Sequence, residues 1–88
     1  MPRGPENSGD PPRVLFGRRL RELREAAGLR QVDVGTRAGV STAYVSELER
    51  GGRGPTLDVI YALARALGVP VSRLFPDPDD DQPHYTHS

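Results

Sequence analysis

Two short amphipathic segments joined by Gly39 constrain the fold of this chain more than any other feature. Val34 and Ala38 lie four residues apart in the first segment, and Val45 and Leu48 lie three apart in the second. Helical residues at these spacings share one face, so each segment has an apolar side for a common core. A glycine between them favours a tight turn. The pattern predicts two helices that pack together, with the N-terminal end of the second exposed.

The rest of the central sequence has the same helical periodicity, without the alternation of a β-strand. The five predicted helices lie at about residues 14–27, 31–38, 42–50, 57–67 and 70–75. Ser41 and Thr56 precede two of them as N-cap residues, and Gly68 follows the fourth. Gly35 is a poor helix former, but a glycine permits close approach of the third helix to the second. We therefore expect a compact all-α domain of five short helices.

The charge of the chain is unevenly distributed, although 12 arginines and 12 acidic residues give a formal net charge of zero. Residues 13–75 carry eleven arginines and six acids, whereas residues 76–88 carry four aspartates. We expect residues 1–12, rich in proline, to be a disordered arm and residues 76–88 to be an acidic flexible tail. The basic domain between them favours polyanionic partners such as nucleic acid.

The composition also argues against several functional classes. Cysteine is absent, so we expect neither a disulfide framework nor a cysteine zinc site. No apolar run has the length of a membrane span, so a cytoplasmic protein without membrane contact is expected. The two histidines, His84 and His87, lie in the acidic tail. We therefore expect no metal site, no cofactor and no enzymatic activity.

The order of the helical motifs resembles the phage-repressor and Cro-like helix-turn-helix family, often called the XRE family. The resemblance covers about residues 14–75 and depends on a series of motifs rather than on any one of them. These are Leu20-Arg21-Glu22-Leu23-Arg24 with Gly28-Leu29, Gln31, Ala38-Gly39-Val40-Ser41, Val45-Ser46-Glu47-Leu48-Glu49-Arg50-Gly51, Pro55-Thr56-Leu57 and Leu63-Ala64-Arg65-Ala66-Leu67-Gly68-Val69. The resemblance implies a lambda-repressor-like DNA-binding domain with its helix-turn-helix at about residues 31–50. The family usually has alanine at Gly35 and often serine at Arg30, so a looser start of the second helix is expected.

The resemblance also implies which residues contact DNA. Base reading falls to the exposed N-terminal half of the recognition helix, at Thr42, Ala43, Ser46 and Glu47. Gln31, Arg50 and Arg53 match positions that contact the DNA backbone, and the chemistry of Arg30 and Tyr44 suits the same role. Arg24 and Glu49 match a pair that forms an internal salt bridge in the family.

Two of these residues have alternative roles. The Glu47 carboxylate accepts a hydrogen bond from a cytosine amino group, or it pairs with Arg50 three residues further along the helix. Tyr44 donates its hydroxyl to a phosphate, packs against the neighbouring helix, or does both. The methyl groups of Thr42 and Ala43 suit contact with thymine.

We expect a sequence-specific DNA-binding transcriptional regulator, a repressor that binds a palindromic operator in double-stranded DNA as a homodimer. Dimerisation is expected because one small domain reaches only one half-site. Val71, Leu74 and Phe75 are the candidate dimer interface, or they close the core of the monomer. Two other functions stay open: an antitoxin-like regulator whose acidic tail binds a partner toxin, and a helical protein-interaction module that does not bind DNA.

Overall fold

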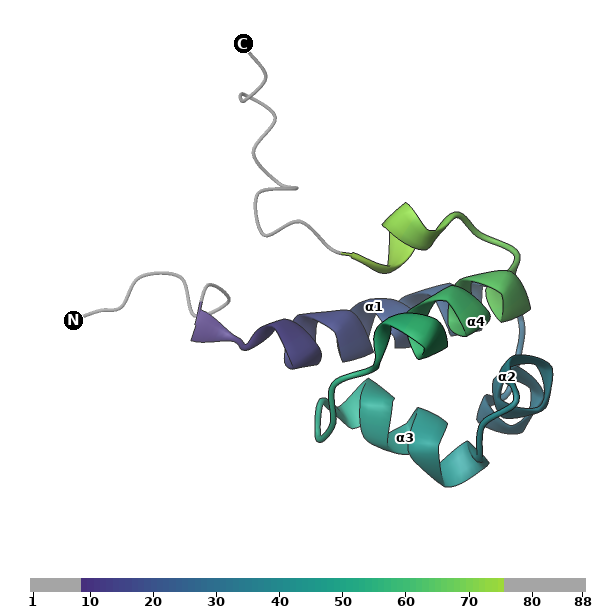
Figure 1. Ribbon diagram of the computed structural model, residues 1–88, viewed down its shortest axis with the longest axis horizontal. Coiled ribbons are helices and arrows are strands. Elements are labelled where there is room, and N and C mark those ends of the chain that lie inside the picture. Colours follow the sequence, from purple (N-terminus) through teal and green to yellow (C-terminus); the bar gives the residue numbers. More distant parts are fainter. Residues whose placement is uncertain (1–8, 76–88) are drawn as a thin grey trace, which may run out of the picture.

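Four α-helices and the 3-10 turn η2 follow one another in residues 9–75, the part of the chain that this computed structural model describes (Figure 1). The elements are α1 (Pro12–Ala26), α2 (Gln31–Ala38), α3 (Thr42–Arg50), α4 (Leu57–Leu67) and η2 (Val71–Leu74). The prediction of an all-α domain is confirmed. The prediction of five helices needs correction, because η2 is one 3-10 turn closed by bonds between residues three apart, Arg73 N to Pro70 O and Phe75 N to Ser72 O. The acidic tail and both histidines lie outside the described residues.

Side-chain caps fix the starts of α3 and α4 where the sequence predicts them. Ser41 Oγ accepts a hydrogen bond from Tyr44 N at 3.0 Å, and Thr56 Oγ1 accepts one from Val59 N at 3.2 Å. Gly39 ends α2 in the left-handed conformation, with φ of 77°, a value that side-chain-bearing residues rarely adopt. The tight turn between α2 and α3 therefore follows directly from local sequence.

The start of α1 differs from expectation, and that of α2 has a contact that was not predicted. α1 begins at Pro12, inside the segment expected to be a disordered arm, because proline lacks an N–H group and has a helical φ, which suits the first helical position. At α2, the Oδ2 atom of Asp33 accepts a hydrogen bond from Arg30 N at 2.8 Å. This bond is the half of a capping box in which the third helical residue binds the N-cap N–H, and it does not replace the contact that a serine at position 30 would make to the first N–H groups of α2. The looser start of α2 therefore stays a prediction.

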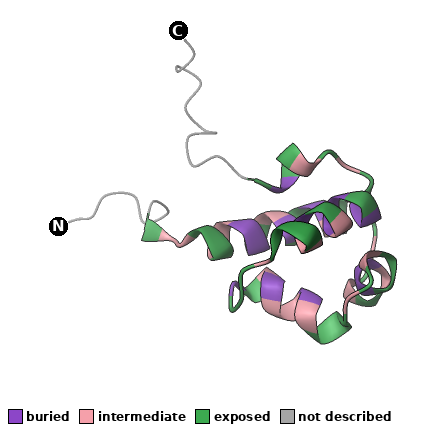
Figure 2. Cartoon of the chain, viewed as in Figure 1, coloured by how far each residue is buried: buried purple, intermediate pink, exposed green. Residues whose placement is uncertain are grey.

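The core receives at least one fully buried side chain from each of the five elements (Figure 2). The largest of these side chains are Leu20, Leu48, Leu63, Leu74, Val34 and Val45. Leu74 has no exposed surface, which supports the alternative that it closes the core of the monomer. Val71 is half-buried, whereas Phe75 keeps 51% of its surface exposed.

Two glycines bring backbone segments unusually close to α3. A Cβ added to Gly17 of α1 would lie 2.1 Å from the carbonyl oxygen of Leu48, and one added to Gly35 of α2 would lie 2.7 Å from that of Val40. The prediction that Gly35 permits close approach of α2 and α3 is confirmed. Gly17 performs the same role between α1 and the end of α3, whereas Gly35 meets the turn that leads into α3.

Candidate nucleic-acid interface

α3 lies at an edge of the molecule, with one face in the core and the other accessible (Figures 1 and 2). Val45 and Leu48 are buried, and α3 packs against both α1 and α2. Thr42 and Ala43 are exposed, and the half-exposed side chains of Ser46 and Glu47 follow on the next turn. All four residues assigned to base reading therefore lie on the accessible part of one helix.

The accessible face of α3 contains a shallow depression of about 450 Å³, here called the outer hollow. Seven residues line the outer hollow: Ser41, Ala43, Tyr44, Ser46, Glu47, Arg50 and Arg53. Six of them belong to the set predicted to contact DNA, and Ser41 was predicted only as a helix cap. Thr42, Gln31 and Arg30 belong to the predicted set but lie outside this lining.

The two arginines of the outer hollow are held in place by side chains of α3. Arg53 Nε lies 3.2 Å from Glu47 Oε1, and its guanidinium carbon lies 5.7 Å from the centroid of the Tyr44 ring. Arg50 Nη1 donates a hydrogen bond to Ser46 Oγ at 2.6 Å, while its Nη2 is 3.9 Å from Glu47 Oε2. Glu47 thus contacts the predicted partner Arg50 only at the limit of an ion pair. Its shorter contact is with Arg53.

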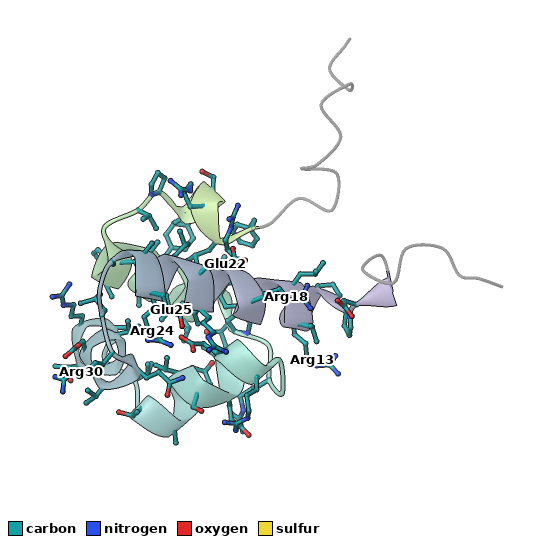
Figure 3. The ribbon with its side chains drawn as sticks, turned by 180° about the vertical axis from the view of Figure 1, so that it is seen from behind. Arg13, Arg18, Glu22, Arg24, Glu25 and Arg30 are labelled. Atoms are coloured by element: carbon teal, nitrogen blue, oxygen red, sulfur yellow. The ribbon has the colours of Figure 1, made fainter. Side chains whose placement is uncertain are left out.

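A second network lies on the opposite, buried side of α3. Arg24 Nε donates to Glu49 Oε2 at 2.6 Å and Arg24 Nη2 to Glu49 Oε1 at 3.0 Å, a bidentate pair between α1 and α3. Figure 3 shows Arg24 between these helices, and the two side chains keep only 13% and 4% of their surface exposed. The hydrogen bonds to Glu49 raise the pKa of Arg24.

Gln31 belongs to this buried network as well as to the start of α2. Its Nε2 donates to Glu49 Oε1 at 2.9 Å, and Arg24 Nη1 donates to the carbonyl oxygen of Leu29 at 2.9 Å. The network therefore ties α1, the start of α2 and α3 together. The predicted phosphate-contacting side chain at position 31 has its amide nitrogen directed to the protein interior.

Arg30 lies at the outside of the molecule beside α2 (Figure 3). Its guanidinium pairs with Asp33, with Nη2 to Oδ1 at 3.0 Å and Nε to Oδ2 at 3.1 Å. The hydrogen bonds from Arg30 lower the pKa of the Asp33 carboxyl to about 2, and the same contacts raise the pKa of Arg30. Arg30 is accessible to a phosphate, but only in competition with this carboxylate.

Two arginines without a predicted role hold the ends of helices. Arg13 Nε donates to the carbonyl oxygen of Gly51 at 3.0 Å and fixes the turn from which Arg53 extends. Arg37 Nη1 lies 3.4 Å from the carbonyl oxygen of Ala66 near the end of α4. Cations at helix ends are favourable because the helix dipole is negative there. The sequence gives no signal for these contacts, since the paired residues are 38 and 29 positions apart.

Residues 9–75 show no arrangement of three or more His, Cys, Asp or Glu side chains that would hold a metal ion. None of the helices within this range is long and apolar enough to cross a membrane.

A short exposed helix, supported by a second helix across a glycine turn, defines the class of helix-turn-helix proteins. The chain belongs to the helix-turn-helix domain family, whose pattern matches residues 15–74. The resemblance found in the sequence is thereby confirmed.

Curated relatives carry the names of transcriptional regulators. The chain is 45% identical over 74 residues to the uncharacterized HTH-type transcriptional regulator y4dJ of Sinorhizobium fredii, which covers 84% of this chain and 95% of the relative. It is 34% identical over 61 residues to the immunity repressor protein of Bacillus phage phi105, covering 69% of this chain. The chain spans only 42% of that repressor and 43% of a second relative, the regulator DdrOP3 of Deinococcus deserti.

Solved structures share the fold. The restriction-modification controller protein C.AhdI from Aeromonas hydrophila is 44% identical and superposes with a TM-score of 0.70 over 72% of this chain and 96% of that one. The P22 c2 repressor, solved in complex with a synthetic operator, is 32% identical with a TM-score of 0.64 over 68% and 91% of the two chains. The lambda-repressor-like fold expected from the sequence is therefore confirmed.

Proposed function

We propose that this chain is a sequence-specific DNA-binding transcriptional regulator that acts as a repressor in the cytoplasm. The observation that carries the proposal is the outer hollow, which Ala43, Ser46 and Glu47 of α3 line together with two exposed arginines. An α-helix of this kind fits the major groove, where base edges present distinct donors, acceptors and methyl groups. The names of the relatives support the same function.

Phosphate contacts are assigned to the rim of this surface. Arg50 and Arg53 keep 64% and 59% of their side-chain surface exposed, which leaves them accessible to the DNA backbone. Tyr44 is partly packed against the core, and its ring lies near the Arg53 guanidinium. Arg30 and Gln31 flank the start of α2, whose positive dipole end attracts phosphate. We assign all five to backbone contacts.

We further propose that the protein binds a palindromic operator as a homodimer. Phe75 is exposed beside an apolar groove of about 490 Å³, which Leu15, Phe16 and Ile60 also line. A second copy of the chain seated on this groove would cover the exposed ring. Phe75 lines this groove together with the fully buried Leu74, and Val71 stays an interface candidate outside the lining. Two recognition helices placed about 34 Å apart reach successive major grooves.

In-vitro selection of bound duplexes from a random DNA pool tests the proposal. We expect enriched sequences with two inverted half-sites whose centres lie about 10 base pairs apart. Arg50→Gln should weaken binding of the selected site, whereas Arg65→Gln, an equal charge change on the exposed surface of α4, should weaken it far less. A pool that shows no enrichment, or equal effects of the two variants, contradicts the proposed surface. Sedimentation equilibrium with Phe75→Ser tests the dimer.

A further inference from the structure

Glu47 is the one acidic residue among those that line the outer hollow. Its carboxylate faces both arginines there, with Oε1 at 3.2 Å from Arg53 Nε and Oε2 at 3.9 Å from Arg50 Nη2. We propose that Glu47 is a specificity-determining residue that weakens binding to non-operator DNA by competing with phosphate for Arg50 and Arg53. The inference rests on the proposed function and concerns how the same surface discriminates between sequences.

The competition follows from the position of the carboxylate. A DNA phosphate and Glu47 are alternative anionic partners for Arg53, which is exposed enough to turn from one to the other. When a phosphate takes the arginines, the Glu47 carboxylate loses its compensating charge while it lies close to the negative DNA backbone. A carboxylate left without a partner in a desolvated interface is unfavourable. This cost applies to every DNA sequence that offers Glu47 no new donor.

The four bases differ in whether their edges offset the unfavourable free energy of a Glu47 carboxylate that has lost its arginine partners. A carboxylate only accepts hydrogen bonds, and the cytosine amino group presents a donor in the major groove. Guanine presents two acceptors and thymine one, while adenine places the N7 acceptor beside its amino donor. A cytosine opposite Glu47 therefore supplies a hydrogen-bond donor to the carboxylate in place of the arginines, and the other bases do so poorly. Glu47 thus acts against wrong sequences more than it favours the right one.

Other contacts keep the arginines on this surface without Glu47. Arg50 donates to Ser46 Oγ at 2.6 Å, and the Arg53 guanidinium lies over the Tyr44 ring. The loop is also fixed through backbone, since Gly52 N donates to the carbonyl oxygen of Glu47 at 3.1 Å. Replacement of the Glu47 carboxylate by an amide therefore removes the competing charge and leaves the local structure in place.

The test compares Glu47→Gln with Glu25→Gln in the full chain. Glu25 is a matched control because it is exposed, pairs with Arg21 Nε at 3.1 Å and lies on α1 (Figure 3). Dissociation constants are measured by fluorescence anisotropy on the selected operator and on a scrambled duplex over a series of salt concentrations. We expect Glu47→Gln to tighten binding to the scrambled duplex about ten-fold and to steepen its salt slope by about 0.9 per protomer, the contribution of one charge. Operator binding should change far less, so the specificity ratio falls.

A double variant tests the assigned partner. With Arg53→Gln already present, Glu47→Gln should tighten scrambled-duplex binding clearly less than it does in the wild-type background. The inference is overturned if Glu47→Gln and Glu25→Gln have equal effects, or if the effect of Glu47→Gln is unchanged without Arg53. A wild-type protein that binds no duplex at low salt would overturn the proposed function itself. If the wild-type protein binds duplex DNA but Glu47→Gln and Glu25→Gln have equal effects, only the inference about Glu47 is overturned.

Discussion

Glu47 and Glu49 lie two residues apart on α3 and both pair with arginine, yet they have opposite surroundings. Glu49 is 4% exposed and accepts from two nitrogens of Arg24 and from Gln31, so its charge is fully compensated inside the protein. Glu47 is 43% exposed and faces arginines that water and salt also reach. The same chemical pair thus holds the domain together on one face of α3. On the other face, in the role that we propose for Glu47, it discriminates between DNA sequences.

The buried and the exposed pair differ in the free energy of unfolding that is lost when one partner is removed. An exposed pair contributes little to stability, because water replaces each partner and side-chain entropy is lost on pairing. A buried pair leaves an uncompensated charge in the interior when one partner is removed. Mutation of the buried Arg24–Glu49 pair, here called the inner pair, should therefore lower the free energy of unfolding. Mutation of the exposed Glu47–Arg53 pair, here called the outer pair, should instead change DNA binding.

The largest effect should come from breaking the inner pair. Arg24→Ala leaves the nearly buried Glu49 carboxylate without its main partner, at a cost of about 3 kcal/mol in the free energy of unfolding. A small domain has a free energy of unfolding of only about 5 kcal/mol, so about 2 kcal/mol would remain and roughly 3% of the molecules should be unfolded at room temperature. Arg53→Ala, on the outer face, should change the free energy of unfolding by less than about 0.5 kcal/mol. Urea denaturation followed by circular dichroism measures both, and equal midpoints would contradict the contrast between the faces.

The inner face should also be intolerant of a single methyl group. Gly17→Ala places a Cβ 2.1 Å from the carbonyl oxygen of Leu48, so α1 and α3 must move apart. The gain in helix propensity is smaller than the packing cost, and we expect a net loss of about 1–3 kcal/mol. Gly54→Ala is the control, since its added Cβ meets only the Cβ of Arg13 at 3.9 Å. Thermal unfolding of the two variants separates the packing effect from a general effect of alanine.

On the outer face, removal of one arginine should alter binding and leave folding intact. In the Glu47→Gln background, where the competition with phosphate is absent, Arg53→Gln should weaken binding to operator and scrambled duplexes alike, because a phosphate contact carries no sequence information. The slope of log K against log salt should become shallower by about 0.9 per protomer. Arg21→Gln on α1, which also loses an exposed carboxylate partner, is the control. A sequence-dependent loss would instead assign Arg53 to base reading.

The sequence predicts those parts of the structure that depend on local chemistry. The bounds of α2, α3 and α4 follow from Ser41, Thr56 and the glycines at helix ends, because caps act within one turn. Leu74 was ambiguous for the opposite reason. A four-residue turn has too little periodicity to distinguish a core residue from an interface residue, so only the packed structure decides its place.

The candidate site shows the same limit in its ion pairs. Helical spacing predicts contact between Glu47 and Arg50, but it says nothing about Arg53, which lies beyond the end of α3. Gly51 reverses the chain in the left-handed conformation, with φ of 79°, and the loop then brings Arg53 back over Tyr44. Gly17 was missed because the carbonyl group that it approaches, that of Leu48, lies far along the sequence, whereas the segment that Gly35 approaches follows α2 directly.

The smallest effect should come from the ion pair between Arg30 and Asp33 at the start of α2. The pKa of Asp33 is lowered from 3.8 to about 2 by the hydrogen bonds from Arg30. A carboxyl group with a lowered folded-state pKa contributes stability that is complete above its unfolded pKa and disappears as the pH falls through the folded value. The melting temperature of Asp33→Asn should therefore lie slightly below that of the wild type at pH 5 to 7. The two should converge between about pH 4 and pH 2, the window between the unfolded and folded pKa values. Glu25→Gln, which removes an exposed pair that caps no helix, is the control. The prediction is contradicted if the difference in melting temperature between wild type and Asp33→Asn stays constant down to pH 2. In that case Asp33 acts as an uncharged hydrogen-bond acceptor that asparagine replaces poorly, and the ion pair with Arg30 does not contribute to stability.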